Sequence, residues 1–288
     1  MPKKKVTEDP VPAMAEGWGV AVNSAGVDDN LSPIGVDFAA EEPAAEPTAD
    51  DWSTVPSAVH SQIFIRENAG GFDPELVKMM VYGESGTQKT RLGSTFPECL
   101  FLDIDKGMES VTEQVDAVDI DTFRQLEDAY AFLNAGGHDY TTVVIDTLNE
   151  MQRITMGATI EEFAQIKRSY GNLPSMSDYG KMLHDWIELT RSFIALPMRV
   201  VLLAQVNTRQ FDTDILMPAL IGKNSAREVA RKMSVIGHIY KSSQEDDDGK
   251  KLSEICFDAE EYVTKDRSYK LPAVLVAPSY ERISAFWK

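Results

Sequence analysis

Cysteine pairs, long apolar runs and basic residues are all scarce in this sequence, and each shortage excludes a class of protein. The two cysteines, Cys99 and Cys256, stand alone inside apolar runs, so no CxxC pair indicates a metal centre and buried, reduced thiols are expected. No apolar run approaches the roughly 20 residues that cross a bilayer. Residues 1–5 are followed by acidic residues rather than by the apolar stretch of a signal peptide. We therefore expect a soluble, cytoplasmic protein with no membrane partner.

Positive charge is limited: 28 Lys and Arg residues stand against 46 Asp and Glu residues, and the formal net charge is −18. Such a surface repels phosphate backbones, so general affinity for nucleic acid is not expected and any such binding would need a local basic patch. The four histidines are scattered, without metal-ligand spacing, and no Ser-His-Asp or Cys-His arrangement indicates nucleophilic catalysis.

Acidic residues are concentrated at the start of the chain. Residues 1–60 hold eleven Asp and Glu residues against three lysines, and they are rich in Ala and Pro. A stretch such as 39–47 cannot bury enough apolar surface to offset the loss of chain entropy. We predict a disordered acidic tail over 1–60 and one domain over 61–288. A docking arm for a basic partner is the alternative for the tail.

The domain alternates short apolar runs with helical patterns. Four runs predict buried strands of a parallel sheet: 77–82, 99–104, 142–145 and 199–204. Two helices are expected between them. One begins with a capping box formed by Thr122 and Gln125. The other carries an apolar stripe, which is typical of core, at Tyr179, Met182, Leu183, Trp186, Leu189 and Phe193. This order predicts a doubly wound, mostly parallel α/β sheet.

A different pattern follows residue 234. Two strand-like segments, 235–240 and 253–257, flank the acidic stretch 245–249, which ends in Asp-Gly. Asp-Gly between two strands predicts a hairpin. The carboxylates of the stretch are interpreted as a solvated hairpin tip, with a divalent-cation site as the alternative.

The strand at 77–82 runs into a glycine-rich segment that follows the phosphate-binding P-loop pattern, with a helix expected over 89–95. A strand that feeds the loop and a helix that leaves it surround phosphates with backbone N–H groups. Lys89 is expected to reach the β- and γ-phosphates, and the Thr90 hydroxyl to bind Mg²⁺. A glycine-rich turn without a nucleotide is the alternative. The predicted phosphate-binding residues are Gly83, Glu84, Ser85, Gly86, Thr87, Gln88, Lys89 and Thr90.

Two further positions bear on this site. Gln88 stands where the pattern has its last glycine, so its side chain is expected to crowd the phosphates or strain the turn, which puts efficient hydrolysis in question more than the fold. Asp146 ends the strand at 142–145, at the sheet edge where ligands bind, and is predicted to hold Mg²⁺. Capping of the next helix is the alternative role of Asp146.

Three later segments resemble parts of RecA-like ATPases. In 101–107, Asp105 takes the place of the carboxylate that polarises the attacking water, with Asp103 as the second choice. Gln205 matches the glutamine that senses the γ-phosphate and is followed by a DNA-binding loop, here 208–223 with Arg209 and Lys223. From the residue pattern alone, Gln205 is a polar residue at a strand end.

The segment 264–267 resembles a third element, a pair of cations that RecA relatives project into the neighbouring subunit's nucleotide. Lys265 and Arg267 match this pair, which would stabilise charge on the transferring phosphoryl group. An exposed basic turn is the alternative.

Together the matches cover about residues 75–280 and most resemble phage-encoded RecA-like ATPases of the single-strand-annealing-associated recombinase group, with an AAA/RecA core. The resemblance implies a RecA-like P-loop NTPase fold over 61–288. It implies an ATP-binding, Mg²⁺-dependent and DNA-stimulated ATPase that acts in phage-type recombination or single-strand handling, in the host cytoplasm if phage-encoded. Implied partners are single-stranded DNA, further copies in a ring or filament, and a single-strand-binding or annealing protein on the tail.

Two other functions remain open. One is a nucleotide-gated structural or adaptor protein that hydrolyses little ATP, with Gln88 as the cause. The other is a small-molecule phosphotransferase, which is less favoured because no Arg-rich lid segment is present. The rate of ATP hydrolysis with and without single-stranded DNA separates the three.

Overall fold

The computed structural model describes residues 70–163, 173–207, 215–222 and 224–288. These residues belong to one compact unit, Glu67–Lys288. The tail predicted over 1–60 lies outside the described residues, and so do Arg209 and Lys223.

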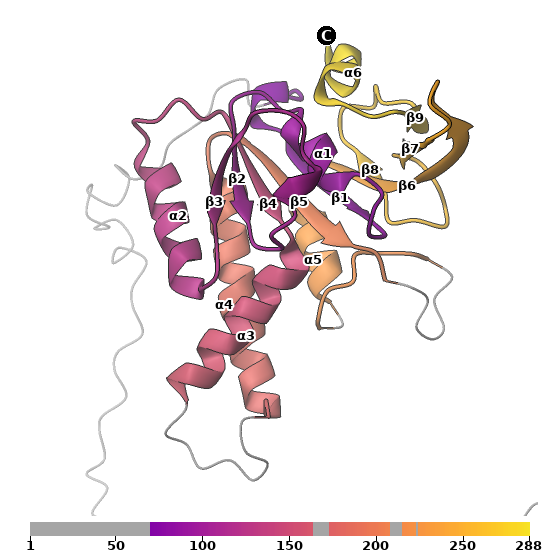
Figure 1. Ribbon diagram of the computed structural model, residues 1–288. Coiled ribbons are helices and arrows are strands. Elements are labelled where there is room, and N and C mark those ends of the chain that lie inside the picture. The colour runs from indigo at the N-terminus through magenta and orange to yellow at the C-terminus, as the bar shows by residue number, and fades with distance from the viewer. Residues whose placement is uncertain (1–69, 164–172, 208–214, 223) are drawn as a thin grey trace, which may run out of the picture. The chain divides into compact units, whose positions relative to one another are not determined.

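The centre of this unit is a nine-stranded sheet (Figure 1). Its strands are β1 (Lys78–Gly83), β2 (Cys99–Asp103), β3 (Asp116–Asp119), β4 (Thr142–Asp146), β5 (Arg199–Gln205), β6 (Val235–Glu245), β7 (Lys251–Cys256), β8 (Lys265–Asp266) and β9 (Val274–Val276). The helices are α1 (Lys89–Ser94), α2 (Phe123–Ala135), α3 (Leu148–Glu162), α4 (Met176–Ala195), α5 (Ser225–Lys232) and α6 (Tyr280–Ser284), with single 3₁₀ turns η3 (Pro74–Leu76), η4 (Met108–Ser110) and η5 (Ala285–Trp287).

The strand order is β3-β2-β4-β5-β1-β6-β7-β9, with β8 paired to β6. The six strands from β3 to β6 are parallel, whereas β7, β8 and β9 are antiparallel to their neighbours. This confirms the predicted mostly parallel α/β fold. β5, late in the chain, lies between β1 and β4, so the carboxyl ends of these three strands meet at one edge of the sheet.

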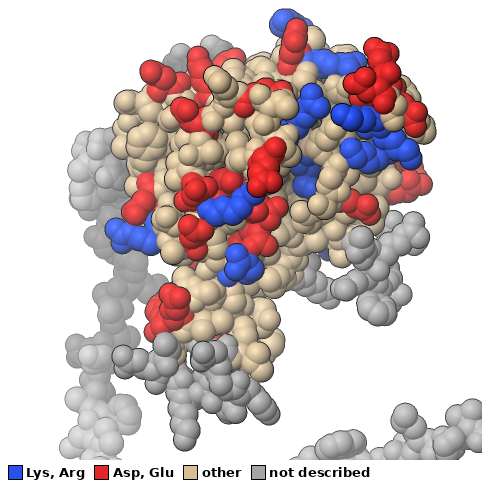
Figure 2. Space-filling model, in the orientation of Figure 1, with Lys and Arg blue, Asp and Glu red and all other residues tan. Residues whose placement is uncertain are grey.

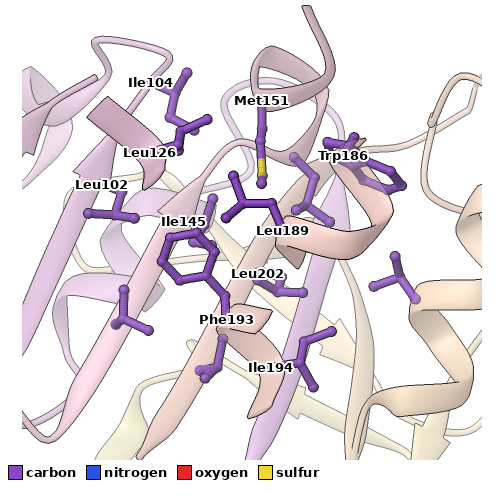
Figure 3. Packing of buried hydrophobic residues seen from close by; sticks show 14 of the residues in the cluster. Leu102, Ile104, Leu126, Ile145, Met151, Trp186, Leu189, Phe193, Ile194 and Leu202 are labelled. Atoms are coloured by element: carbon purple, nitrogen blue, oxygen red, sulfur yellow. The ribbon is translucent and has the colours of Figure 1, made fainter. Parts of the chain in front are cut away.

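Each face of the sheet is covered by its own apolar cluster. One cluster packs α2, α3, α4 and α5 against one face, and Figure 3 shows its residues converging from the sheet and three of these helices. The other packs α1, α6 and η5 against the opposite face. Burial on both faces explains why β1, β2, β4 and β5 are continuous apolar runs rather than alternating ones.

The predicted helices and the hairpin are present. Thr122 and Gln125 form the expected capping box of α2. Four residues of the α4 stripe are buried, and Leu183 is partly buried. The first residue of the stripe, Tyr179, is 36% exposed because it lies in the first turn of the helix, next to the exposed Met176. At the hairpin tip the Asp246 carboxylate accepts the backbone N–H groups of Asp248 and Lys250, so it stabilises the turn between β6 and β7.

The remaining expectations concern thiols, metals and membranes. Cys99 and Cys256 are buried and unpaired, and burial raises the pKa of the Cys99 thiol to about 11. Among the described residues, no group of three or more His, Cys, Asp or Glu side chains is arranged to hold a metal ion. None of the described helices combines the length and the apolar character needed to span a bilayer.

Candidate functional site

The predicted P-loop connects the end of β1 to the start of α1. Gly83 lies where β1 pairs closely with β6, and a Cβ there would lie only 2.1 Å from the carbonyl oxygen of Ile239. Gly86 has a φ of +76°, in the left-handed region that glycine adopts without strain. Glycine is therefore required at Gly83 by the close approach of β6, and it is favoured at Gly86 by the backbone conformation.

Lys89 is the buried centre of this loop. Its ammonium group donates to the carbonyl oxygens of Gly83, at 3.0 Å, and Glu84, at 2.9 Å. It also lies 3.4 Å from the side-chain oxygen of Gln205 at the end of β5. Burial lowers the pKa of Lys89, while the charges of Asp146 and Asp105 act in the opposite direction. The loop thus brings one cation to the edge where three strands end.

Thr90 and Asp146 meet beside this lysine. The Thr90 hydroxyl donates to the Asp146 carboxylate at 2.6 Å, and Asp146 is only 2% exposed. Burial raises the pKa of Asp146 to about 6, and the nearby charge of Asp105 adds to the shift, whereas the Thr90 hydrogen bond and Lys89 oppose it. Two oxygen atoms of the kind that Mg²⁺ prefers therefore lie side by side.

The two aspartates that follow β2 have different surroundings. Asp103 is buried, and its carboxylate accepts the N–H of Gly107 at 3.1 Å. Asp105 has an exposed side chain, while its backbone N–H donates to the carbonyl oxygen of Asp146. Partial desolvation raises the pKa of Asp105, and Glu150 adds to this shift. Of the two, Asp105 is the carboxylate that faces solvent next to Asp146.

Gln88 adopts the left-handed backbone conformation, with φ 69° and ψ 32°. This conformation is the reason the P-loop pattern places glycine here, because a side chain at positive φ is unfavourable by about 1–2 kcal/mol. The Gln88 side chain itself is exposed. The departure from the pattern therefore strains the backbone at the point where the loop enters α1.

Comparison with known families agrees with this geometry. A family model described as an AAA domain matches residues 75–268, about two thirds of the chain. The chain belongs to this AAA-domain family. The match supports a nucleotide-binding domain of the P-loop ATPase type, and it spans every strand from β1 to β8. No curated protein matches the sequence.

Two predicted residues of the AAA domain lie away from its P-loop. Lys265, on β8, pairs with Ile236 near the start of β6, whereas Gly83 of the P-loop pairs with Ile239. Lys265 donates to the carbonyl oxygens of Ala230 and Arg231, and Arg267 also donates to the latter. Both cations thus contact the last turn of α5. Within one chain, they are not brought together with Lys89.

Two further residues of the AAA domain, Asn149 and Gln152 in α3, were not predicted from the sequence. Asn149 accepts the backbone N–H of Gln205 at 2.8 Å, and Gln152 accepts that of Ile221 at 2.8 Å. The sequence does contain one signal for them: two amide side chains lie three residues apart, and hence on one face of a helix, shortly after Asp146. The backbone groups that they bind are more than fifty positions away, and the sequence does not indicate them.

A cavity of about 530 Å³ lies beside the P-loop of the AAA domain. It is bordered by α1, the β6–β7 hairpin and the segment 277–279. Gln88 and Leu92 line one side and Lys251 another. Ser253 also lines it, and its hydroxyl is buried without a hydrogen-bond partner among the described residues. The cavity adjoins the loop at Gln88, so the two form one continuous surface.

Proposed function

We propose that this AAA domain is a Mg²⁺-dependent, DNA-stimulated ATPase of the phage RecA-like type, which assists recombination or single-strand handling. The observation that supports this most is the contact between the Lys89 ammonium group, at the start of α1, and the Gln205 side-chain oxygen, at the end of β5, which are 3.4 Å apart. A group that senses the γ-phosphate must reach the P-loop lysine and also continue into the segment that responds. Gln205 meets both conditions, because it ends β5 and the segment 206–222 follows it.

The side chains around Lys89 have distinct roles in this proposal. Lys89 contacts the β- and γ-phosphates, and Asp105 accepts a proton from the attacking water as general base. Thr90 and Asp146 would hold Mg²⁺, since their oxygens are adjacent and the buried carboxylate lacks a cation of its own within hydrogen-bonding distance among the described residues. The ion would offset charge on the phosphates. Asp105 is exposed, so water reaches it without a change of structure.

The nucleoside of ATP is proposed to occupy the cavity beside the P-loop. A nucleotide with its phosphates on the N–H groups of the loop extends past Gln88, and the cavity begins at that residue. Its volume of about 530 Å³ lies in the range of small-molecule sites.

Partners of the domain are also proposed. Single-stranded DNA is assigned to the segment 208–223 because it follows Gln205 and carries Arg209 and Lys223. On the visible face in Figure 2, the blue Lys and Arg residues are interspersed with red Asp and Glu residues on a mainly tan surface, which does not favour general DNA affinity. A ring or filament of identical chains would bring Lys265 and Arg267 to a neighbour's nucleotide. The acidic tail would recruit a single-strand-binding or annealing protein.

One observation favours a second function. Gln88 holds a backbone conformation that suits glycine, at the residue before Lys89. A loop strained at this point would bind ATP and hydrolyse it slowly, so the domain would act as a nucleotide-gated adaptor. Slow hydrolysis that DNA leaves unchanged is the result that would identify this function.

The test measures ATP hydrolysis by the full chain with Mg²⁺ or with EDTA, each with and without single-stranded DNA. The Lys89→Ala variant gives the background from contaminating enzymes. We expect Mg²⁺-dependent turnover above that background, raised several-fold by DNA. Tight ATP binding without turnover would overturn the ATPase in favour of the adaptor. Phosphate transfer to a small acceptor would indicate a phosphotransferase.

A further inference from the structure

The last residue of β5 has an unusual backbone partner. In the register of the sheet, β4 ends at Asp146 opposite Leu203, so β5 extends two residues beyond it. On its other side β5 still pairs with β1, where the N–H of Val206 donates to the carbonyl oxygen of Gly83 at 3.2 Å. The N–H of Gln205 therefore has no strand partner on the β4 side.

Asn149 takes the place of the missing strand. Its side-chain oxygen accepts the N–H of Gln205 at 2.8 Å, and its amide nitrogen donates to the carbonyl oxygen of Ala219. The N–H of Ala219 returns to the carbonyl oxygen of Gln205 at 2.8 Å. These three hydrogen bonds form a closed ring. One side chain of α3 thus binds the N–H of Gln205 directly, and it binds Ala219, whose N–H in turn holds the carbonyl oxygen of Gln205.

Gln152 provides an internal comparison. Its side chain accepts the N–H of Ile221 at 2.8 Å and donates to the carbonyl oxygen of the same residue at 3.1 Å. Gln152 is more deeply buried than Asn149, at 1% exposed. Both amides anchor the segment 216–222 to α3, but only Asn149 contacts β5.

We infer that Asn149 is a positioning residue, which fixes the end of β5 so that the Gln205 side chain faces Lys89. It also ties Gln205 to the segment 216–222, so a change at the phosphate end of the site moves both together. This inference rests on the proposed ATPase function. Asn149 lies in the first turn of α3, three residues after Asp146, so the helix that follows the proposed Mg²⁺ residue also holds the proposed sensor.

The first experiment compares Asn149→Leu, which keeps the shape but loses both hydrogen bonds, with the matched control Gln152→Met. Asn149→Leu is expected to lower kcat about tenfold or more with nearly unchanged ATP affinity, because a small misplacement of a reacting group has a large effect on rate. Gln152→Met is expected to keep kcat within about threefold, even if it unfolds at a lower temperature. Equal kcat in Asn149→Leu and the parent would overturn the inference.

A double-mutant cycle separates positioning from general damage. If Asn149 acts through Gln205, adding Asn149→Leu to Gln205→Ala causes no further loss of kcat. Independent losses that multiply would show that Asn149 does not act through Gln205.

A final measurement does not depend on turnover. Amide hydrogen exchange in Asn149→Leu should lose protection at Gln205 and at Ala219, whereas Gln152→Met should lose it at Ile221. If the parent shows no hydrolysis above the Lys89→Ala background, the proposed function fails. Retained protection at Gln205 in Asn149→Leu would refute the positioning role whether or not the parent hydrolyses ATP.

Discussion

Two lysines of this protein, one at the start of α1 and one on β8, make the same kind of contact. Lys89 donates to the carbonyl oxygens of Gly83 and Glu84, and Lys265 donates to those of Ala230 and Arg231. In each case an ammonium group satisfies two backbone oxygens at the end of a secondary-structure element. The hydrogen bonds alone do not distinguish the two lysines.

The surroundings distinguish them. Lys89 is 6% exposed and lies among Asp146, Asp105 and Gln205, where three parallel strands end. Lys265 is half-buried, and its pKa is lowered by burial and then by the positive charge of Arg267. Its hydrogen bonds stabilise the C-terminal end of α5. We propose that Lys89 contributes mainly to function and that, within the single chain, Lys265 contributes mainly to stability. The following predictions test this division, from the largest expected effect to the smallest.

Replacing Lys89 should have the largest effect. Lys89→Ala is expected to lower ATP turnover by about a hundredfold or more, because removing one group that stabilises transition-state charge has an effect of this size. Stability should change little, since the loss of two hydrogen bonds is offset by the removal of a buried charge. Turnover, ATP affinity and thermal unfolding are measured together. Unchanged affinity and turnover in a folded variant would exclude the P-loop assignment.

Replacing Lys265 and Arg267 in dilute protein should have the opposite result, a loss of stability with ATP binding retained. The double alanine variant is expected to lose about 1–2 kcal/mol of unfolding free energy, because three hydrogen bonds to carbonyl oxygens of α5 are removed. ATP binding should be retained. Lys241→Ala, at an exposed lysine of β6, is the control and should unfold like the parent.

The same double variant tests the proposed shared site. If Lys265 and Arg267 act on a neighbour's nucleotide, assembled protein loses turnover, and mixing with Lys89→Ala restores part of it, since mixed interfaces pair an intact P-loop with intact cations. If the two variants co-assemble but mixing does not restore turnover, and the double variant is less stable, these cations have a structural role alone.

His238 extends the comparison to pH. It lies on β6, 5% exposed, with its ring stacked 4.2 Å from that of Tyr262, and burial lowers its pKa to about 4. Because the unfolded chain binds a proton near pH 6.5 and the folded chain does not, His238 stabilises the fold above pH 6.5. That contribution is lost as the pH falls towards 4. About 2 kcal/mol should disappear between pH 7 and pH 5.

Urea unfolding at both pH values measures this loss, and His238→Phe is the control. The aromatic replacement keeps the stacking but does not titrate. The difference between the two proteins also removes the contribution of Asp146, whose raised pKa has the opposite effect on stability. An identical pH dependence in parent and variant would contradict the prediction.

Gln88→Gly should have a smaller effect in the P-loop. Relief of the left-handed conformation is partly offset by the greater entropy of glycine in the unfolded chain, so we expect a gain of about 1 kcal/mol or less. Turnover should rise if the strain slows hydrolysis. In an adaptor, the same change should create activity that the parent lacks. No change in turnover would mean that the loop accommodates the outward side chain.

Deletion of residues 1–60 should have the smallest effect of all. No core pattern lies in this segment, so ATP binding and the unfolding temperature of the remaining chain should stay nearly the same. A large loss of stability would show that part of the segment packs on the domain.

The sequence alone determined the elements whose residues are adjacent in the chain. A buried strand, a glycine-rich loop and a helix follow one another from residue 78 to residue 94, so the P-loop was predictable. The positions of Asp146 and Gln205 at strand ends were predictable for the same reason, because each follows an apolar run, whereas the role of Gln205 was implied only by the resemblance to RecA-like ATPases. Elements with few apolar residues were missed. All four residues of the edge strand β3 are exposed, and half of the residues of the short α5 are charged.

Tertiary structure decided which of these residues meet. The insertion of β5 between β1 and β4 brings Gln205 to Lys89, although the two residues are 116 positions apart. The same insertion leaves the N–H of Gln205 without a strand partner on the β4 side, so Asn149 takes that place. The pairing of β8 with β6 puts Lys265 beside α5 instead of the P-loop. Local patterns specify strands and turns, whereas the order of strands depends on contacts between distant segments that a single sequence does not display.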